Sequence, residues 1–264
     1  MFALITVSFL FISESIANEN CLEENAINKP VLARYEIKTQ VGNKTESKLF
    51  TIVRSENRVA YSSGEVIEVW EKTSNNKIKL YKFFNQAERG IEYQPVDIVN
   101  VDNIDWNAKR QLVSDRFTRQ FELVKQKSKN CKLHQLYRSQ TRASKQHEDG
   151  VNNRLEKKES LKIVWISSVK LPAIMKHKRY NAKTSWELVE LEKGADKASE
   201  FMKRLDDFSL IDYSDIGDNE SDPFLQKMIN LGFVAHSDPF YYSSKTGIYS
   251  EPSHSKNHEH GHAH

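Results

Sequence analysis

Residues 65–98 (EVIEVWEKTSNNKIKLYKFFNQAERGIEYQPVDI) are the feature that most restricts the possible folds of this chain. As the two sides of a strand, Val66, Glu68 and Trp70 alternate with Ile67, Val69 and Glu71. Asn75 and Asn76 follow, two residues that tolerate a positive φ and therefore favour a tight turn. Residues 77–84 then run back, and a third short run ends at Pro95, which has no N–H to donate to a ladder. The stretch predicts three consecutive antiparallel strands.

Further strands are predicted on both sides of this meander. Residues 31–41 alternate without interruption, as expected for a strand with one buried side and one side facing water. The other predicted strands are residues 48–54, 58–61, 116–126, 131–138, 161–166, 172–177 and 185–192. Residues 116–126 also fit a helical spacing, through Phe117 and Phe121, so a helix remains the alternative there. So many strands joined by short turns predict a wide, twisted antiparallel sheet.

Short helices are expected to cover this sheet. Residues 105–113 contain good helix formers behind the N-cap candidate Asp105, and residues 198–205 and 223–231 are predicted helices as well. Residues 141–160 contain almost no apolar side chains and predict a loop. The expected fold is α+β and β-dominated: a wide curved antiparallel sheet, half-barrel or open barrel, with a few short covering helices and a disordered C-terminal tail.

The beginning of the chain predicts export. An apolar run too short to span a bilayer ends in small residues at the two positions that a signal peptidase reads, which predicts that residues 1–17 are a cleaved signal peptide. A buried first strand or helix is the alternative. No later segment is apolar for long enough to cross a membrane, so we expect a periplasmic or secreted protein. Its single β-rich domain would span residues 18–236, with the polar insert at 141–160 and a flexible tail at 237–264.

The two cysteines of the chain, Cys21 and Cys131, are the simplest candidates for a disulfide in an oxidising compartment. Closing a loop of this length is worth about 4–5 kcal/mol in the chain-entropy model. Two unpaired buried thiols are the alternative. The spacing excludes a CxxC-type zinc or redox site.

The charge balance argues against nucleic-acid binding. The formal charge is +3, from 39 basic and 36 acidic residues, and the two signs are interspersed along the chain. Local basic patches at residues 125–132 and 176–179 do not change this interpretation, because specific nucleic-acid binding requires a continuous basic footprint.

The order of elements resembles the periplasmic lipoprotein carriers and receptors of the LolA/LolB type. The order is a signal peptide, an antiparallel meander, a strand opened by Leu171 and Pro172, a polar turn, and a strand containing WELVEL at residues 186–191. Past the signal peptide, the resemblance covers about residues 30–192. The family fold is a half-barrel whose sheet wraps around helices and leaves an apolar cavity for acyl chains. The long polar insert and the C-terminal helices and tail depart from that pattern. No cargo-binding residue matches one for one, so the resemblance implies a fold and no site.

The C-terminus carries the sharpest local motif. Five of the nine histidines lie in the last eleven residues: His254, His258, His260, His262 and His264. A spacing of two places the last four imidazoles on one side of an extended chain, and imidazole suits copper, zinc and nickel. A solvated tail without a function and a purification tag are the alternatives, although the residues between the histidines argue against a tag.

No motif predicts catalysis. His134, His147, His177 and His236 are dispersed, and none lies beside a nucleophile motif. Any cavity inside the sheet would be lined by the large aromatic residues Trp70, Trp106, Trp165, Trp186, Phe83, Phe84 and Tyr93, which are otherwise core residues. The sequence therefore predicts a non-enzymatic envelope protein whose curved sheet holds a hydrophobic ligand or a protein partner. The alternative is a metal-handling accessory protein that binds copper, zinc or nickel through the tail.

Overall fold

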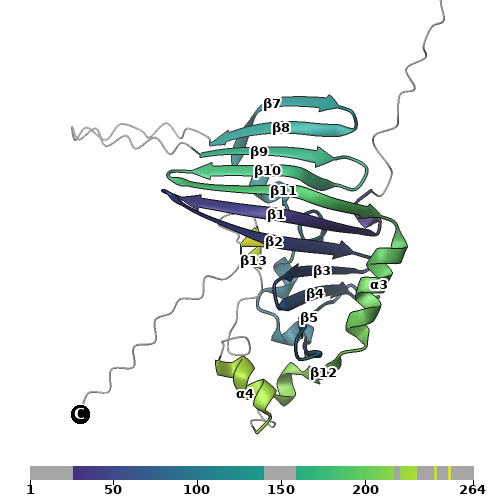
Figure 1. Cartoon of the computed structure of the whole chain (residues 1–264). Helices are drawn as coiled ribbons and strands as arrows, with labels where there is room; N and C mark the ends of the chain where they lie inside the picture. Colours follow the sequence, from purple (N-terminus) through teal and green to yellow (C-terminus); the bar gives the residue numbers. More distant parts are fainter. Residues whose placement is uncertain (1–25, 140–158, 217–220, 231–240, 243–248, 251–264) are drawn as a thin grey trace, which may run out of the picture.

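The structure, a computed structural model, describes residues 26–139, 159–216, 221–230, 241–242 and 249–250 (Figure 1). The predicted signal peptide and most of the polar insert and of the C-terminal tail lie outside these residues. The extents of the domain and the tail therefore stay predictions.

Twelve strands form one curved sheet in the described part of the chain (Figure 1). Their spatial order is β12-β6-β5-β4-β3-β2-β1-β11-β10-β9-β8-β7. All neighbours pair antiparallel except β12, the edge strand, which pairs with β6 in parallel. The strands are β1 (Val31–Val41), β2 (Lys44–Arg54), β3 (Arg58–Ser63), β4 (Val66–Lys72), β5 (Ile78–Phe84), β6 (Arg89–Tyr93), β7 (Phe121–Lys129), β8 (Lys132–Ser139), β9 (Glu159–Ile166), β10 (Leu171–Arg179), β11 (Ala182–Lys193) and β12 (Ser209–Asp212). The predicted wide antiparallel sheet is confirmed.

The helices are short and few, as the sequence predicts. They are α1 (Trp106–Gln111), α2 (Asp115–Thr118), α3 (Ala195–Asp206) and α4 (Pro223–Asn230), with 3-10 turns η1 (Ala26–Asn28), η2 (Pro95–Asp97), η3 (Val101–Asn103) and η4 (Tyr213–Asp215). The predicted N-cap of α1 is confirmed, because the Asp105 carboxylate accepts a hydrogen bond from the Ala108 N–H at 3.0 Å. Two short strands that the sequence did not predict, β13 (Tyr241–Tyr242) and β14 (Tyr249–Ser250), pair near the C-terminus.

One strand prediction is partly wrong. Residues 115–118 form the helix α2, and β7 begins only at Phe121, so the helical alternative holds for the start of the segment 116–126. The Ser114 hydroxyl caps this helix by accepting from the Phe117 N–H at 3.0 Å. The following turn is also displaced, because Asn130 and Cys131 adopt the positive φ angles that close the β7–β8 hairpin. Alternation alone does not report such a cap.

The sheet has two unequal faces, which we call inner and outer. The inner face carries the main core, which includes Tyr35, Trp70 and Trp186 and is covered by the segment that contains α1 and α2. The outer face carries a smaller core under α3, formed around Val53, Ala60, Ile67, Val69 and Phe83. The apolar stripe of α3, Ala198, Met202 and Leu205, completes that core. Truncating a fully buried leucine in such a core costs about 2–5 kcal/mol.

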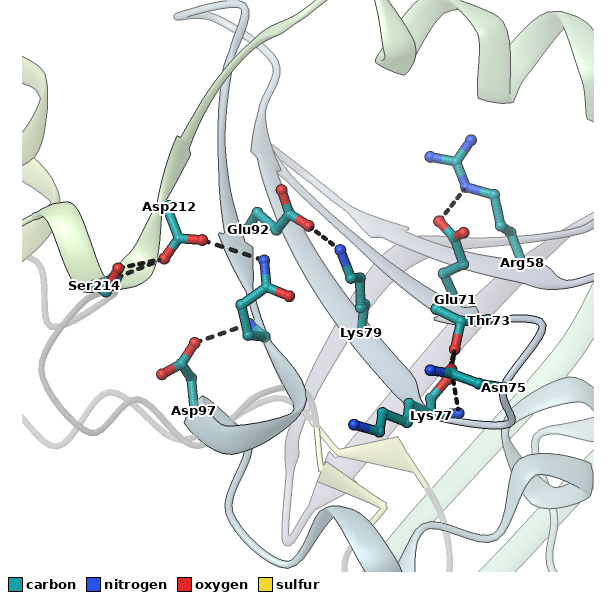
Figure 2. Close-up of polar contacts among 11 residues, drawn as sticks. Arg58, Glu71, Thr73, Asn75, Lys77, Lys79, Glu92, Asp97, Asp212 and Ser214 are labelled. Atoms are coloured by element: carbon teal, nitrogen blue, oxygen red, sulfur yellow. Dashed lines mark hydrogen bonds and ion pairs between the residues drawn. The ribbon is translucent and has the colours of Figure 1, made fainter.

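Opposite charges face one another on the outer surface of β3–β6 (Figure 2). Arg58 on β3 pairs in register with Glu71 on β4, their charged atoms 3.6 Å apart, and Lys79 on β5 lies opposite Glu71. The Lys79 ammonium also contacts the Glu92 carboxylate of β6 at 2.7 Å. Cross-strand pairs of opposite charge stabilise a solvent-facing sheet surface.

A side-chain hydrogen bond links β12 to the residue that follows β6. The Gln94 side chain, just after β6, donates to the carboxylate of Asp212 at 3.2 Å, and Asp212 accepts from Ser214 (Figure 2). The hydrogen bonds from Ser214 and Gln94 lower the pKa of the Asp212 carboxyl group below its ordinary value. Among the described residues, no helix is both long enough and apolar enough to cross a lipid bilayer.

Candidate functional site

The predicted metal ligands are not brought together by the part of the chain that the structure describes. The five tail histidines, His147 and His236 lie outside it, and metal binding by the tail stays a prediction. His134 on β8 pairs with Val164, whereas His177 on β10 pairs with Leu161, so the two imidazoles lie on opposite faces of the sheet. Within the described residues, no three His, Cys, Asp or Glu side chains form a group that could hold a metal ion.

The predicted disulfide also stays a prediction. Cys131 lies in the β7–β8 turn, and its carbonyl accepts a hydrogen bond from the Ser167 N–H at 3.2 Å. The described part of the chain contains no free cysteine. Cys21 itself lies outside that part.

The predicted cavity-lining aromatics divide between the two faces. Trp70, Trp186, Phe84 and Tyr93 are buried in the inner core, and Trp106 and Trp165 pack against it while remaining partly exposed. Phe83 is the exception to the prediction, because its side chain belongs to the outer core under α3. The inner face is therefore the aromatic face of the sheet.

Three charged side chains are buried within this aromatic surface. Glu68 on β4 and Lys82 on β5 lie directly opposite each other, and Lys109 reaches down from α1. All three are at most 6% exposed. The Lys109 ammonium lies 3.3 Å from the centre of the Trp70 ring, and the Trp70 indole N–H donates to the Glu68 carboxylate. We call Glu68, Lys82 and Lys109 the buried charge cluster.

Burial dominates the electrostatics of Lys109. Loss of solvent lowers the pKa of the Lys109 ammonium to about 7, and the nearby Glu68 carboxylate opposes that shift. The Lys109 backbone carbonyl accepts a hydrogen bond from the Tyr61 hydroxyl on β3, which fixes α1 over the sheet. Sequence reasoning missed this cluster, because Lys109 reads as an ordinary helix-forming residue. The alternation of residues 66–71 did place Glu68 on the same side as Trp70.

Two buried arginines anchor the covering segment. Arg54 at the end of β2 donates to the carbonyls of Arg110, Val169 and Lys29 at 2.7–3.1 Å. Arg110 in turn donates to the Ser55 carbonyl at 2.7 Å. Burial lowers the pKa of both guanidinium groups, to about 9 for Arg54 and about 10 for Arg110, so both stay charged at neutral pH. Their bonds to backbone carbonyls indicate a structural role.

The inner face continues from the core to a partly exposed flank on β7–β10. Leu123 on β7 lies in register with the buried Tyr137 and is 45% exposed. Leu133 on β8 lies opposite Trp165, and both are only partly buried. The Trp165 indole N–H donates to Gln135 at 2.8 Å. We call Leu123, Leu133, Gln135 and Trp165 the open flank.

Polar and aromatic side chains meet at the border of this flank. The His177 imidazole lies 2.7 Å from the Glu159 carboxylate, and the rings of Phe117 and Phe121 stand edge-on to it. Burial raises the pKa of the neighbouring Tyr137 hydroxyl, and the charge of Asp115 raises it further. These contacts orient the His177 imidazole, and none of them is with a serine or cysteine side chain that could act as a nucleophile.

Trp186 has a buried donor with no acceptor among the described residues. Its side chain is 2% exposed and packs edge-on against the rings of Phe50 and Tyr35. The indole N–H finds no hydrogen-bond partner in the described part of the chain. Buried donors without an acceptor are rare in folded proteins, because leaving one costs about 1–3 kcal/mol. By register, one inner-face row runs from Trp186 through Met175 and Ile163 to Gln135 of the open flank.

Comparison with known proteins gives structural likenesses only. No family model matches the sequence, and no curated protein matches it. Among solved structures, a DUF1329 family protein from Desulfovibrio piger has a TM-score of 0.30 and 6% identity, over 64% of this chain and 87% of that one. An outer membrane lipoprotein-sorting protein domain from Vibrio parahaemolyticus has a TM-score of 0.30 and 6% identity, over 70% and 94%.

A third likeness is of the same kind. A LolA superfamily protein from Nitrosomonas europaea has a TM-score of 0.23 and 8% identity, over 64% of this chain and 87% of that one. Proteins of the type that the sequence resembles are thus among the structural likenesses. At these values, neither a function nor a binding residue transfers from them to this chain.

Proposed function

We propose that this protein is a non-enzymatic periplasmic or secreted binding protein that holds a hydrophobic ligand against the inner face of its sheet. The observation that carries the proposal is the continuity of that face. It passes from a buried aromatic core to the open flank, where Leu123 is 45% exposed beside the buried Tyr137. Apolar surface of this kind lowers its free energy when an apolar chain covers it, by about 25 cal/mol per Å².

The indole N–H of Trp186, which has no acceptor in the described part of the chain, supports a particular ligand chemistry. Met175 and Ile163 of the inner-face row are at most 1% exposed, so a ligand reaches the indole N–H by displacing what covers this row. An apolar chain that does so would bring a carbonyl, ester or carboxylate oxygen to the N–H. The ligand that fits is therefore an acyl chain with a hydrogen-bond acceptor at one end. The apolar segment of an envelope protein is the second occupant that this chemistry allows.

A lipid extraction tests the proposal first. The protein is expressed with its full N-terminal sequence, purified from the periplasm of a bacterial host, extracted with organic solvent and analysed by mass spectrometry. We expect a co-purifying acyl lipid. Dibromostearate then serves as a defined ligand, because bromine quenches the fluorescence of tryptophans that it approaches.

Two exposed leucines provide a matched pair of variants. Leu123 lies on the inner face and Leu49 on the outer face, where it pairs with Glu36 and is 59% exposed. We expect Leu123→Asp to weaken dibromostearate binding at least about tenfold, because a carboxylate replaces a side chain whose burial is worth about 1.5–3 kcal/mol. Leu49→Asp should bind as the wild type does. Equal binding by both variants would place the ligand elsewhere.

The Trp186 donor gives a second, independent readout. Trp186→Phe keeps the aromatic packing and removes the N–H. We expect about fivefold weaker binding of dibromostearate, the value of one hydrogen bond of about 1 kcal/mol, and no loss of stability in the lipid-free protein. A loss of stability with unchanged binding would show that the N–H serves the fold.

A further inference from the structure

Beyond the smaller core under α3, the outer face of the sheet is strongly basic. Across β7–β11 and the adjoining β1, the solvent-facing side chains include eight exposed cations: Lys38, Lys125, Lys127, Arg138, Lys162, Lys176, Lys178 and Lys183. We call these eight residues the basic face. The whole chain has a formal charge of only +3, so the fold separates charges that are mixed along the sequence.

The register of the sheet places like charges directly against each other on the basic face. Lys176 on β10 lies opposite Lys162 on β9, and Lys178 on β10 lies opposite Lys183 on β11. Like charges directly opposite each other destabilise a sheet, by a few tenths of a kcal/mol to about 1 kcal/mol per pair. The basic face therefore lowers the stability of the fold.

The carboxylates of this surface compensate only part of its charge. Lys176 contacts Glu187 at 2.9 Å, and Lys38 contacts Glu36 at 2.9 Å. Glu122 lies opposite Arg138 in the β7–β8 register. Two further carboxylates on the same side of β11 are Glu192, opposite Leu32, and Glu190, which pairs with Arg34. Five carboxylates therefore stand against the eight cations of the basic face and Arg34.

Elsewhere in the same sheet, opposite charges lie next to each other. On the outer surface of β3–β6, Arg58, Glu71, Lys79 and Glu92 alternate in sign from strand to strand (Figure 2). The opposite charges of β3–β6 are partly buried, whereas the like-charge pairs of the basic face lie on exposed side chains. Like-charge pairs lower the free energy of unfolding. A negatively charged partner that binds this surface is expected to relieve the repulsion and stabilise the fold.

We propose that the basic face docks on the surface of a membrane that contains anionic phospholipids. Two neighbouring hairpin tips border it, β1–β2 and β10–β11, which are joined by a hydrogen bond from the Gly42 N–H to the Asn181 carbonyl at 3.5 Å. These tips expose Val41 at 52% and Tyr180 at 51%. Basic side chains bordered by exposed apolar and tyrosine side chains match the headgroup region, where cations meet phosphates and tyrosine rings enter the interface.

A lipid surface fits this face better than a nucleic acid does. Single-stranded nucleic acid binds to several stacked aromatic rings, whereas Tyr180 is the one exposed large aromatic side chain of the described residues. Each lysine near an anionic leaflet contributes a free energy that corresponds to about a fivefold gain in binding. The inference is independent of the ligand on the inner face, because it concerns the opposite surface.

Co-sedimentation with vesicles tests the docking surface. The protein exported from its full-length sequence is mixed with vesicles of phosphatidylcholine, with or without phosphatidylglycerol, at about pH 7.5, where the unperturbed tail histidines are largely neutral. We expect binding only to the vesicles with phosphatidylglycerol, and we expect it to fall steeply between about 50 mM and about 500 mM NaCl.

The double variant Lys162→Glu with Lys183→Glu separates function from folding. Each new carboxylate lies opposite a lysine, Lys176 or Lys178, so the variant should unfold at a temperature at or above that of the wild type. Its vesicle binding should fall at least about tenfold. Lys203→Glu with Lys227→Glu, on exposed positions of α3 and α4, changes the net charge equally and should leave binding unchanged.

Three outcomes would overturn the proposal. They are equal binding to neutral and anionic vesicles, equal losses in the two double variants, and no vesicle binding at all. The last would direct the search to an acidic protein as the partner of the basic face. A gain in thermal stability together with a loss of vesicle binding would support the proposal.

Discussion

Replacing Lys109 by methionine tests whether a charge is buried between the covering segment and the inner face. Methionine keeps an unbranched side chain of similar length against Trp70 and removes the ammonium group. Lys109 is 6% exposed, and burial lowers the pKa of its ammonium from 10.5 to about 7. The variant should therefore change how stability depends on pH.

The sign follows from proton linkage. Between pH 7 and pH 10.5 the unfolded chain keeps a proton on Lys109 that the folded protein has released, so the free energy of unfolding rises as the pH rises through this window. Below about pH 7 both states are protonated and the contribution of Lys109 is constant. From pH 7.5 to pH 9 the expected gain is about 2 kcal/mol, at 1.36 kcal/mol per pH unit. Lys109→Met should lose this gain.

The measurement is urea unfolding of wild type and variant at several pH values between about 7.5 and 9. Arg54, whose pKa burial lowers to about 9, adds its own dependence in the upper part of this range, and it does so in the wild type and the variants alike. Lys203→Met, at an exposed position of α3, is the matched control and should keep the wild-type slope. If Lys109→Met also keeps that slope, the ammonium is solvated or paired at all pH values and the assigned burial is wrong.

Two further predictions concern the two cysteines and the C-terminal histidines. Thiol titration of the exported, unreduced protein in denaturant should find no free sulfhydryl if Cys21 and Cys131 are bonded, whereas two free thiols would remove the disulfide. Calorimetry should show copper, zinc or nickel binding that disappears on deletion of residues 254–264 and weakens as the pH falls through about 6.5, because a protonated imidazole cannot donate to a metal. Undiminished binding after the deletion would move the site to other histidines, and no binding by either form would leave the tail without a metal function.

Strands were predictable where one face of the sheet is buried and the other faces solvent. The alternation of residues 31–41 reproduces β1 at both ends, and the Asn75–Asn76 turn is confirmed by the positive φ of Asn76. Hairpin partners follow from such runs, because a turn and a period of two determine which residues lie opposite each other. The wide antiparallel sheet was therefore accessible from local patterns.

The closing strands were not accessible in the same way. β12 has only four residues, Ser209–Asp212, and it pairs in parallel with β6, which lies more than a hundred residues earlier. The pairing of β1 with β11 is equally distant in sequence. Pairing between strands that are far apart in the sequence depends on the packing of the complete core, so a short stretch of sequence does not predict it.

The candidate site was predicted in kind but not in detail. The aromatic residues of the inner face were identified, yet Phe83 turned out to face α3 on the other side. The charge of Lys109 gave no sign of burial, because a lysine on a short helix is ordinarily solvated. Only the packing of α1 against Trp70 makes that side chain a buried cation.

The basic face shows why composition is a poor guide to electrostatic partners. Along the sequence, six or more residues separate Lys162, Lys176 and Lys183 from one another, and the near-neutral total argues against an anionic partner. The register of β9, β10 and β11 places these lysines side by side on one solvent-facing surface. The potential above a surface depends on which charges lie within about a Debye length of one another, roughly 8–10 Å at physiological salt, and not on the total. An anionic membrane therefore meets a strongly basic patch on a chain whose net charge is small.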